Sequence, residues 1–319
     1  MTLEPETLTV GRIGVDLYAE DLNASFTEAR RFVKSIGGSP TNVAVALARL
    51  GHRAAVLTKV GDDGLGDYVR TALVDEFGVD TRFVGVHPTL QTPIVVAALD
   101  PPEDPQFVFY REPAAPDSTI LPGEVDLELV ERVPILWISA GALAVEPSRG
   151  TTRTLLERRV RRPHTILDLD YRPSFWAGED EARQEISATL DDVTIAIGNR
   201  AECEIAVSET DPDAAADALL DRGLEVAVVK LGGEGVLVAT REERRVAPAV
   251  PVDVVCGLGA GDAFGGAFCH GLLDGLTPFA AAELGNAAGA IVASRLLCAD
   301  AMPTQDELRG LLETMRAGR

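Results

Sequence analysis

The sequence has 319 residues, of which 50 are acidic and 29 are basic, and its formal net charge is −21. The length suffices for one large α/β domain or two smaller ones, and the hydrophobic content of 46% indicates a well-filled core. The negative charge argues against nucleic acid and against an anionic membrane surface as partners, because both would repel the chain.

In chain order, short apolar runs alternate with helical patterns over most of the length. The predicted strands lie at 8–14, 54–60, 135–140, 165–169, 193–197 and 226–231, followed by a hairpin-like pair at 235–239 and 246–255. The predicted helices lie at 40–50, 65–76, 149–159, 179–190, 201–207, 213–222, 263–273, 278–294 and 304–315. This alternation predicts a doubly wound, mostly parallel sheet with helices on both faces, which binds ligands beyond the carboxyl ends of its strands.

Two stretches, at about 15–36 and 84–112, interrupt the alternation because neither is flanked by helices of its own. The second holds apolar runs at 94–99 and 107–110, separated by the proline-rich turn 101–105. We interpret both stretches as a small β-sheet inserted into one domain that covers residues 1–319. Such an insertion commonly forms a lid or a dimer contact.

The run from Cys256 to Phe264 joins an apolar stretch to a helix through a glycine turn. Backbone N–H groups are free at such a turn and the helix dipole favours negative charge, so the turn attracts a phosphate or another oxyanion. Asp262 stands in this turn, and its presence is explained if it takes a proton from a hydroxyl group that attacks a phosphate. The alternative is an aspartate that only caps the helix.

Weaker motifs lie at other strand ends and turns. Asp16 follows the first strand, and Gly38 and Asn42 lie at a helix start, where they suit a ligand rich in hydroxyl groups. Asn199 and Glu202 lie at another strand–helix junction and suit a hydrated Mg²⁺ near phosphates, with Glu202 as the metal ligand through water. Taken singly, each motif is more typical of a turn or a capped helix than of a binding site.

Lys230 begins a glycine turn that includes Gly232 and Gly235. Such a turn can lie against a bound nucleotide, although a simple hairpin turn also explains it. The P-loop pattern is absent, and the dinucleotide pattern G-x-G-x-x-G fails at its last position.

Arginines indicate the charge of the substrate. Arg172 follows a central strand and is expected to point into the ligand crevice, where Tyr110 and Arg111 on the lid meet it from above. Two arginines facing one pocket imply an anionic group on the substrate beyond the nucleotide phosphates. Surface salt bridges are the alternative.

The remaining signals concern compartment and metals. None of the four cysteines forms a C-x-x-C pair, which predicts free thiols in a reducing compartment. No signal peptide or membrane span is recognised, so we expect a soluble, cytoplasmic protein. The four histidines are scattered without metal-ligand spacing, and we interpret them as structural or surface residues.

Together the motifs resemble the ribokinase-like (PfkB) carbohydrate kinases over essentially the whole chain. The glycine pair at 37–38 followed by Asn42, the Asn199/Glu202 motif, the turn 230–235 and the run 259–262 occur in the family's order and spacing. The resemblance implies a doubly wound α/β fold with a small β lid, transfer of phosphate from ATP to a sugar with Mg²⁺, and a homodimer formed through the lid.

The resemblance also implies roles for individual residues. Asp262 becomes the catalytic base, and the backbone of Gly259, Ala260, Gly261 and Asp262 becomes the anion hole. Sugar binding falls to Asp16, Gly38 and Asn42. Contact with the phosphate–Mg²⁺ region falls to Asn199 and Glu202, and contact with the nucleotide falls to Gly232, Gly235 and Asn286.

Within the family, the stretches 11–18, 109–113, 167–173 and 298–303 resemble the kinases of inositol catabolism that act on 5-dehydro-2-deoxygluconate. This implies a keto-sugar acid whose carboxylate meets Arg172 and Arg111 and whose C6 hydroxyl is phosphorylated. The alternatives are a 2-dehydro-3-deoxygluconate kinase, another ribokinase-like sugar kinase, a nucleoside kinase, and a non-catalytic sugar-acid sensor.

One departure concerns Cys256, which stands where family members commonly carry Asp or Asn beside a monovalent cation. A thiol is a poor ligand for K⁺, so we expect turnover to depend only weakly on this cation.

Overall fold

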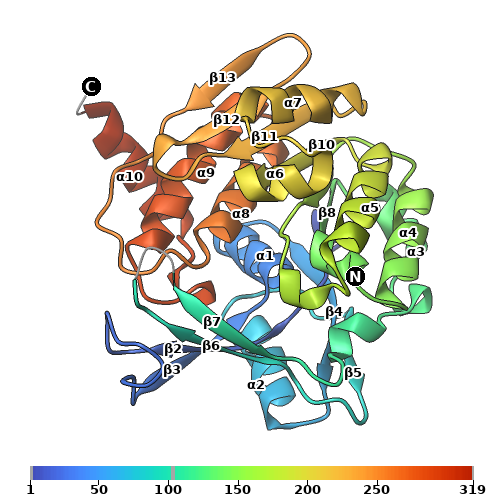
Figure 1. The fold of residues 1–319 in the computed structure, drawn as a ribbon, viewed down its shortest axis with the longest axis vertical. Coiled ribbons are helices and arrows are strands. Elements are labelled where there is room, and N and C mark those ends of the chain that lie inside the picture. The colour runs from blue at the N-terminus through green and yellow to red at the C-terminus, as the bar shows by residue number, and fades with distance from the viewer. Residues whose placement is uncertain (1–2, 102–104, 318–319) are drawn as a thin grey trace.

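The computed structural model describes residues 3–101 and 105–317, so residues 102–104 of the predicted lid turn lie outside the described residues. A nine-stranded sheet in the order β13-β12-β11-β10-β9-β8-β1-β4-β5 forms the centre of the molecule (Figure 1). The strands from β11 to β5 in this order are parallel, and β12 pairs antiparallel with both of its neighbours. The predicted mostly parallel sheet is therefore confirmed.

The sheet consists of β1 (Thr7–Val10), β4 (Ala54–Gly61), β5 (Val84–His87), β8 (Ile135–Ser139), β9 (Thr165–Asp168), β10 (Ile195–Asn199), β11 (Val226–Lys230), β12 (Val236–Ala239) and β13 (Arg244–Ala247). The last strand ends earlier than predicted, since residues 248–255 form no strand. Pro248 and Pro251 lie in that segment, and proline cannot donate a ladder hydrogen bond.

Helices cover both faces of the sheet. Successive side chains of a strand point to opposite faces, and in the buried strands both sets are apolar. In β8, Ile135 and Trp137 join one core, and Leu136 and Ile138 join the other. The first core includes α1 (Ser39–Arg49), α2 (Gly64–Asp75), α8 (Ala260–Leu273), α9 (Pro278–Ala293) and α10 (Gln305–Ala317). The second includes α3 (Leu127–Arg132), α4 (Ser148–Arg159), α5 (Glu179–Thr189), α6 (Arg200–Val207) and α7 (Pro212–Asp221).

A separate four-stranded sheet, here called the lid sheet, has the order β3-β2-β6-β7. Its strands are β2 (Gly14–Ala19), β3 (Phe32–Gly37), β6 (Ile94–Ala98) and β7 (Gln106–Tyr110). The predicted lid boundary at residue 84 is wrong, because β5 pairs parallel with β4 in the large sheet. The segment β4–α2–β5 is a βαβ unit, in which the second strand returns beside the first.

Within the described ranges, no helix combines the length and the apolar character needed to cross a membrane.

A buried arginine holds together the segments that precede β8 and β9 at one end of the large sheet. Arg159, the last residue of α4, is only 2% exposed, and burial lowers its pKa to about 10. Its guanidinium group donates hydrogen bonds to Thr165 and to five backbone carbonyls. Two are in the last turn of α3 and three are in the loops before β8 and β9: those of Val130, Glu131, Val133, Pro134 and Pro163. The side chain thus replaces backbone partners that these loops lack.

We expect Arg159→Lys to lower the free energy of unfolding by about 2–4 kcal/mol, because an ammonium group cannot reach all of these carbonyls and leaves some of them buried and unpaired. Urea denaturation measures the change. Arg158→Lys is the matched control on the same helix, where the side chain is half exposed and pairs with Glu131, and it should change stability by about 0.5 kcal/mol or less. Equal losses in the two variants would contradict this role.

Candidate active site

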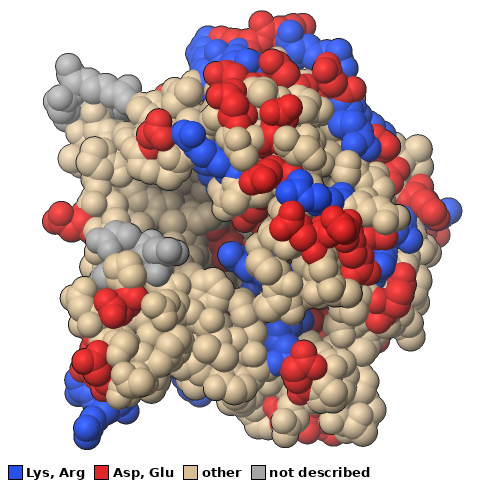
Figure 2. All heavy atoms as spheres, viewed as in Figure 1, with Lys and Arg blue, Asp and Glu red and all other residues tan. Residues whose placement is uncertain are grey.

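A cavity of about 520 Å³ lies between the lid sheet and the carboxyl ends of the parallel strands. Figure 2 shows a hollow in this region with acidic and basic side chains inside it. Side chains that follow β1, β9, β10 and β11 line it, together with the starts of α1 and α8 and the inner face of the lid sheet. Its volume is typical of a site for a small organic ligand.

The N-terminus of α8 forms one wall of the cavity. Gly259 adopts a φ of +81° and packs against Cys298, so that a side chain at this position would collide with the thiol. The first helical hydrogen bond runs from the N–H of Ala263 to the carbonyl of Gly259. The N–H groups of Ala260, Gly261 and Asp262 therefore have no acceptor within the helix, which makes this end attractive to an anion.

Asp262 lies in the first turn of α8 and lines the cavity. The side-chain amide of Asn42, on α1, donates a hydrogen bond of 2.8 Å to its Oδ2 atom. Burial raises the pKa of Asp262, and the hydrogen bond from Asn42 opposes this shift. The Oδ1 atom of Asn42 is buried and lacks a hydrogen-bond partner among the described residues. Asn42 thus holds the carboxylate of Asp262 in place at the wall of the cavity.

A second wall carries the pair Lys230 and Glu202. Asn199 and Glu202 form a capping box at the start of α6, in which each side chain accepts the backbone N–H of the other residue. This is the capping pattern that the sequence left open, and it also holds both side chains against the cavity. The Nζ atom of Lys230 lies 3.6 Å from Glu202 Oε2, and Asp168 lies nearby on β9. Burial raises the pKa of Asp168, although Lys230 opposes the shift.

Two arginines share one carboxylate on the floor of the cavity. Arg12 donates to Oδ2 of Asp170 at 2.7 Å, and Arg172 lies 3.1 Å from its Oδ1. Burial raises the pKa of Asp170, but the two guanidinium groups outweigh it and hold that pKa below its usual range. Arg12 was missed from the sequence, although it follows a parallel strand, β1, as Arg172 follows β9. Its Nε is buried and has no partner among the described residues.

The lid sheet contributes both polar and apolar side chains. Asp16 on β2 accepts a 3.0 Å hydrogen bond from Tyr18, and burial raises its pKa to about 6. Gly37, which pairs with Gly14 across the lid sheet, leaves space for this carboxylate that a side chain would fill. Phe107 and Phe109 on β7 complete the apolar part of the lining.

The structure does not bring Tyr110 and Arg111 to this cavity. Successive side chains of a strand point to opposite faces, so Tyr110 lies on the outer face and is 62% exposed, whereas Phe109 faces inward. Arg111 instead pairs with Asp117 through both of its terminal nitrogens and lies over the ring of Phe175. Arg12, rather than Arg111, is the second arginine of the site.

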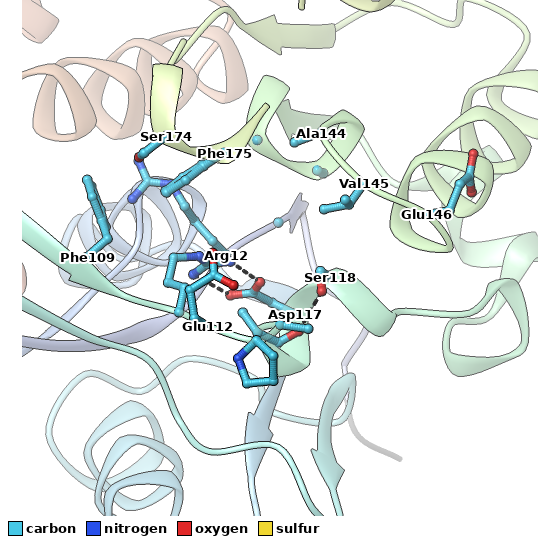
Figure 3. A pocket seen from close by; sticks show the side chains of 17 residues that line it. Arg12, Phe109, Glu112, Asp117, Ser118, Ala144, Val145, Glu146, Ser174 and Phe175 are labelled. Atoms are coloured by element: carbon cyan, nitrogen blue, oxygen red, sulfur yellow. Dashed lines mark hydrogen bonds and ion pairs between the residues drawn. The ribbon is translucent and has the colours of Figure 1, made fainter. Parts of the chain in front are cut away.

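Arg111 belongs to a neighbouring pocket of about 290 Å³, which shares Arg12 and Phe109 with the main cavity. Figure 3 shows Arg12, Phe109, Phe175 and Asp117 around this pocket. Because Asp117 neutralises Arg111, the smaller pocket does not offer a free cation to an anionic ligand.

Other predicted site residues occupy supporting positions. Gly38 and Gly232 line the cavity, whereas Gly235 lies against the backbone at the end of β13 and Asn286 donates to the carbonyls of Ala247 and Pro248. Asn286 therefore holds the loop after β13 to α9. Cys256 is fully buried beside Tyr18 and Cys298, and the weak K⁺ dependence expected for it stays a prediction.

The donor set fits ATP and Mg²⁺. Carboxylate and amide oxygens of Glu202 and Asn199 suit a hard divalent cation, and Lys230 suits a phosphate, as do the free N–H groups of α8. All of these groups line or border the same cavity.

Comparison with known proteins identifies the family. The family described as pfkB family carbohydrate kinase matches residues 5–305. A protein of Geobacillus thermodenitrificans named 5-dehydro-2-deoxygluconokinase is 31% identical over 98% of this chain and 94% of its own length.

Two solved structures share the fold. The fructokinase of Vibrio cholerae, solved with fructose, ADP and calcium ion, is 25% identical with a TM-score of 0.83, over 96% of this chain and 98% of its own. The aminoimidazole riboside kinase of Salmonella enterica, complexed with its riboside and an ATP analogue, is also 25% identical with a TM-score of 0.79, over 96% and 99%. One fold thus accepts different substrates, and the side chains of the cavity must decide between them.

Proposed function

The chain belongs to the pfkB family of carbohydrate kinases, and on that premise we propose that it phosphorylates the C6 hydroxyl of a keto-sugar acid, 5-dehydro-2-deoxygluconate. ATP is the phosphate donor and Mg²⁺ the cofactor. The observation that carries the acid is the pair Arg12 and Arg172 on the cavity floor. The name of the Geobacillus relative supports the same substrate.

The reaction follows from the arrangement around α8. The Asp262 carboxylate takes the proton of the C6 hydroxyl, whose oxygen forms a bond to the γ-phosphorus of ATP while the bond to the β–γ bridging oxygen breaks and ADP leaves. The free N–H groups at the start of α8 stabilise the negative charge on the transferring group. Glu202 and Asn199 would hold Mg²⁺, which would supply positive charge against the phosphates. Lys230 adds a fixed positive charge beside them.

The two arginines supply the acid specificity. Asp170 neutralises only part of the combined charge of Arg12 and Arg172, which leaves a net positive charge on the cavity floor for a further carboxylate. A carboxylate bound there places the far end of a short sugar chain toward Asp262 and Asn42, across the apolar side chains of Phe107 and Phe109. A 2-dehydro-3-deoxygluconate substrate has the same charge and is the alternative that these contacts also accept.

We expect Asp262→Asn to lower kcat roughly 10²–10⁴-fold, the usual contribution of a general base. Its melting temperature should not fall, because burial raises the pKa of Asp262, which means that folding disfavours the ionised carboxylate and that a neutral amide avoids this cost. Steady-state kinetics and thermal unfolding measure the two effects. Retention of near-normal kcat would contradict the role of Asp262 as the base.

We expect Arg172→Gln to lower kcat/KM about 10- to 100-fold on a keto-sugar acid, and much less on its neutral sugar analogue, because a charge-assisted contact with the carboxylate is lost. Arg111→Gln is the matched control: it breaks an ion pair with Asp117 outside the cavity and should affect both substrates equally. An equal loss on acid and neutral sugar in Arg172→Gln would exclude the carboxylate role.

We also propose a homodimer formed through the outer face of the lid sheet. Phe32, Val108 and Tyr110 are between 39% and 62% exposed, and the strand register places them on the face opposite Asp16 and Phe109. Phe32 lies on the edge strand β3, and Val108 and Tyr110 lie on the opposite edge strand β7, so exposed apolar side chains occur at both edges of this face, as in a contact surface.

Light scattering during gel filtration tests this dimer. We expect Val108→Lys to shift the protein from dimer to monomer. Val246→Lys, which replaces a similarly exposed valine on β13 at the far edge of the large sheet, should leave the mass unchanged. A monomeric unmodified protein, or a dimer that tolerates Val108→Lys, would contradict the proposed interface.

The cytoplasm is the compartment we propose. The four cysteines are free and buried, as expected for a chain folded under reducing conditions.

A further inference from the structure

The fold brings together two histidines that lie far apart in the sequence. His52 follows α1, and His270 lies in the last turn of α8. The Nε2 atom of His52 is 2.7 Å from Nδ1 of His270, and the two rings are mostly buried. Asp274, one turn further along, reaches 3.7 Å from Nε2 of His270 and 3.9 Å from Nε2 of His52. None of these residues lines the active-site cavity.

These three side chains have the composition of a transition-metal site. Each can offer one ligand atom, and the three atoms lie within 4.8 Å of one another. The spacing His-x-x-x-Asp along α8 places both groups on the same helix face.

Glu6 supplies the outer contact that metal-binding histidines usually have. Its Oε2 atom lies 3.7 Å from Nδ1 of His52, on the side of the ring away from His270, and also accepts the backbone N–H of Arg53. This distance exceeds that of a hydrogen bond, so Glu6 would orient the ring only once metal binding brings the two groups together, as carboxylates behind metal-binding histidines do. Because Glu6 also pairs with Arg53 at 3.3 Å, the negative charge beside the rings comes from Asp274.

We propose that His52, His270 and Asp274 bind a divalent transition-metal cation of the Zn²⁺ class, with Glu6 as the positioning residue for His52. Imidazole ligands favour Zn²⁺, Ni²⁺ or Co²⁺ over Mg²⁺, which prefers oxygen. The site is therefore chemically distinct from the Mg²⁺ position near Glu202. Water would complete the coordination, because Asp274 is about half exposed.

The position of the cluster gives the bound ion a structural role. It joins the segment after α1 to the last turn of α8, and these two helices pack against each other in the first core. His270 is eight residues from Asp262, or about 12 Å along the helix, so the ion would not touch the reacting atoms. Occupancy should stabilise the folded protein, because the unfolded chain does not hold the three ligands together.

The test is titration of Zn²⁺ into the untagged, metal-free protein, followed by calorimetry, in excess Mg²⁺ to occupy the active site. We expect one Zn²⁺ per chain and a rise in melting temperature. Co²⁺ should give ligand-field absorption that changes when His52 is replaced.

Four variants define the ligands. His52→Gln and Asp274→Asn should abolish the one-to-one binding and the thermal shift while the proteins stay folded without metal, and Glu6→Gln should weaken affinity about tenfold or more. His164→Asn, at a histidine outside the cluster, should bind as the unmodified protein does. Absence of Zn²⁺ binding, or binding that survives both His52→Gln and Asp274→Asn, would overturn the proposal and leave a hydrogen bond between two imidazoles.

Discussion

The crowding of five carboxyl groups into one cavity with three cationic side chains is the constraint on which the site depends. Asp16, Asp168, Asp170, Glu202 and Asp262 face Arg12, Arg172 and Lys230. The two arginines hold Asp170 ionised, whereas burial raises the pKa of Asp262. A carboxylate of raised pKa is the better base. The many carboxylates of the cavity would repel a nucleoside triphosphate unless Mg²⁺ accompanied it.

The parallel sheet solves the problem of assembling these charges. Side chains distant in the sequence follow β1, β9, β10 and β11, and parallel pairing brings the carboxyl ends of these strands to one edge. The lid sheet covers that edge with Asp16 and two phenylalanines. The glycine turn then aims the start of α8 at the same space. The arginines on the cavity floor suit a carboxylate, and the start of α8 suits a hydroxyl group that receives phosphate. This arrangement fits the proposed substrate, which is acidic at one end and a primary alcohol at the other.

The sequence carried most of the fold because strand and helix periods alternate clearly, and it carried the α8 turn because glycines and Asp262 are adjacent in the chain. It could not reveal contacts that depend on register. Tyr110 and Arg111 are neighbours in the sequence. The alternation of side chains along β7 places Tyr110 on the outer face of the lid sheet, and Arg111 forms an ion pair with Asp117. In the sequence Arg12 is an ordinary loop residue, and only the pairing of β1 with β8 brings it to the site. His52 and His270 come into contact only because α1 packs on α8.

The most direct test of the account is ATP turnover by the unmodified protein on a matched panel: 5-dehydro-2-deoxygluconate, 2-dehydro-3-deoxygluconate, fructose, ribose and a nucleoside. The arrangement of Arg12 and Arg172 predicts that kcat/KM is higher on the two keto-sugar acids than on the neutral sugars, by at least tenfold. A preference for fructose, ribose or the nucleoside over both acids would contradict the central claim that the two arginines select a carboxylate.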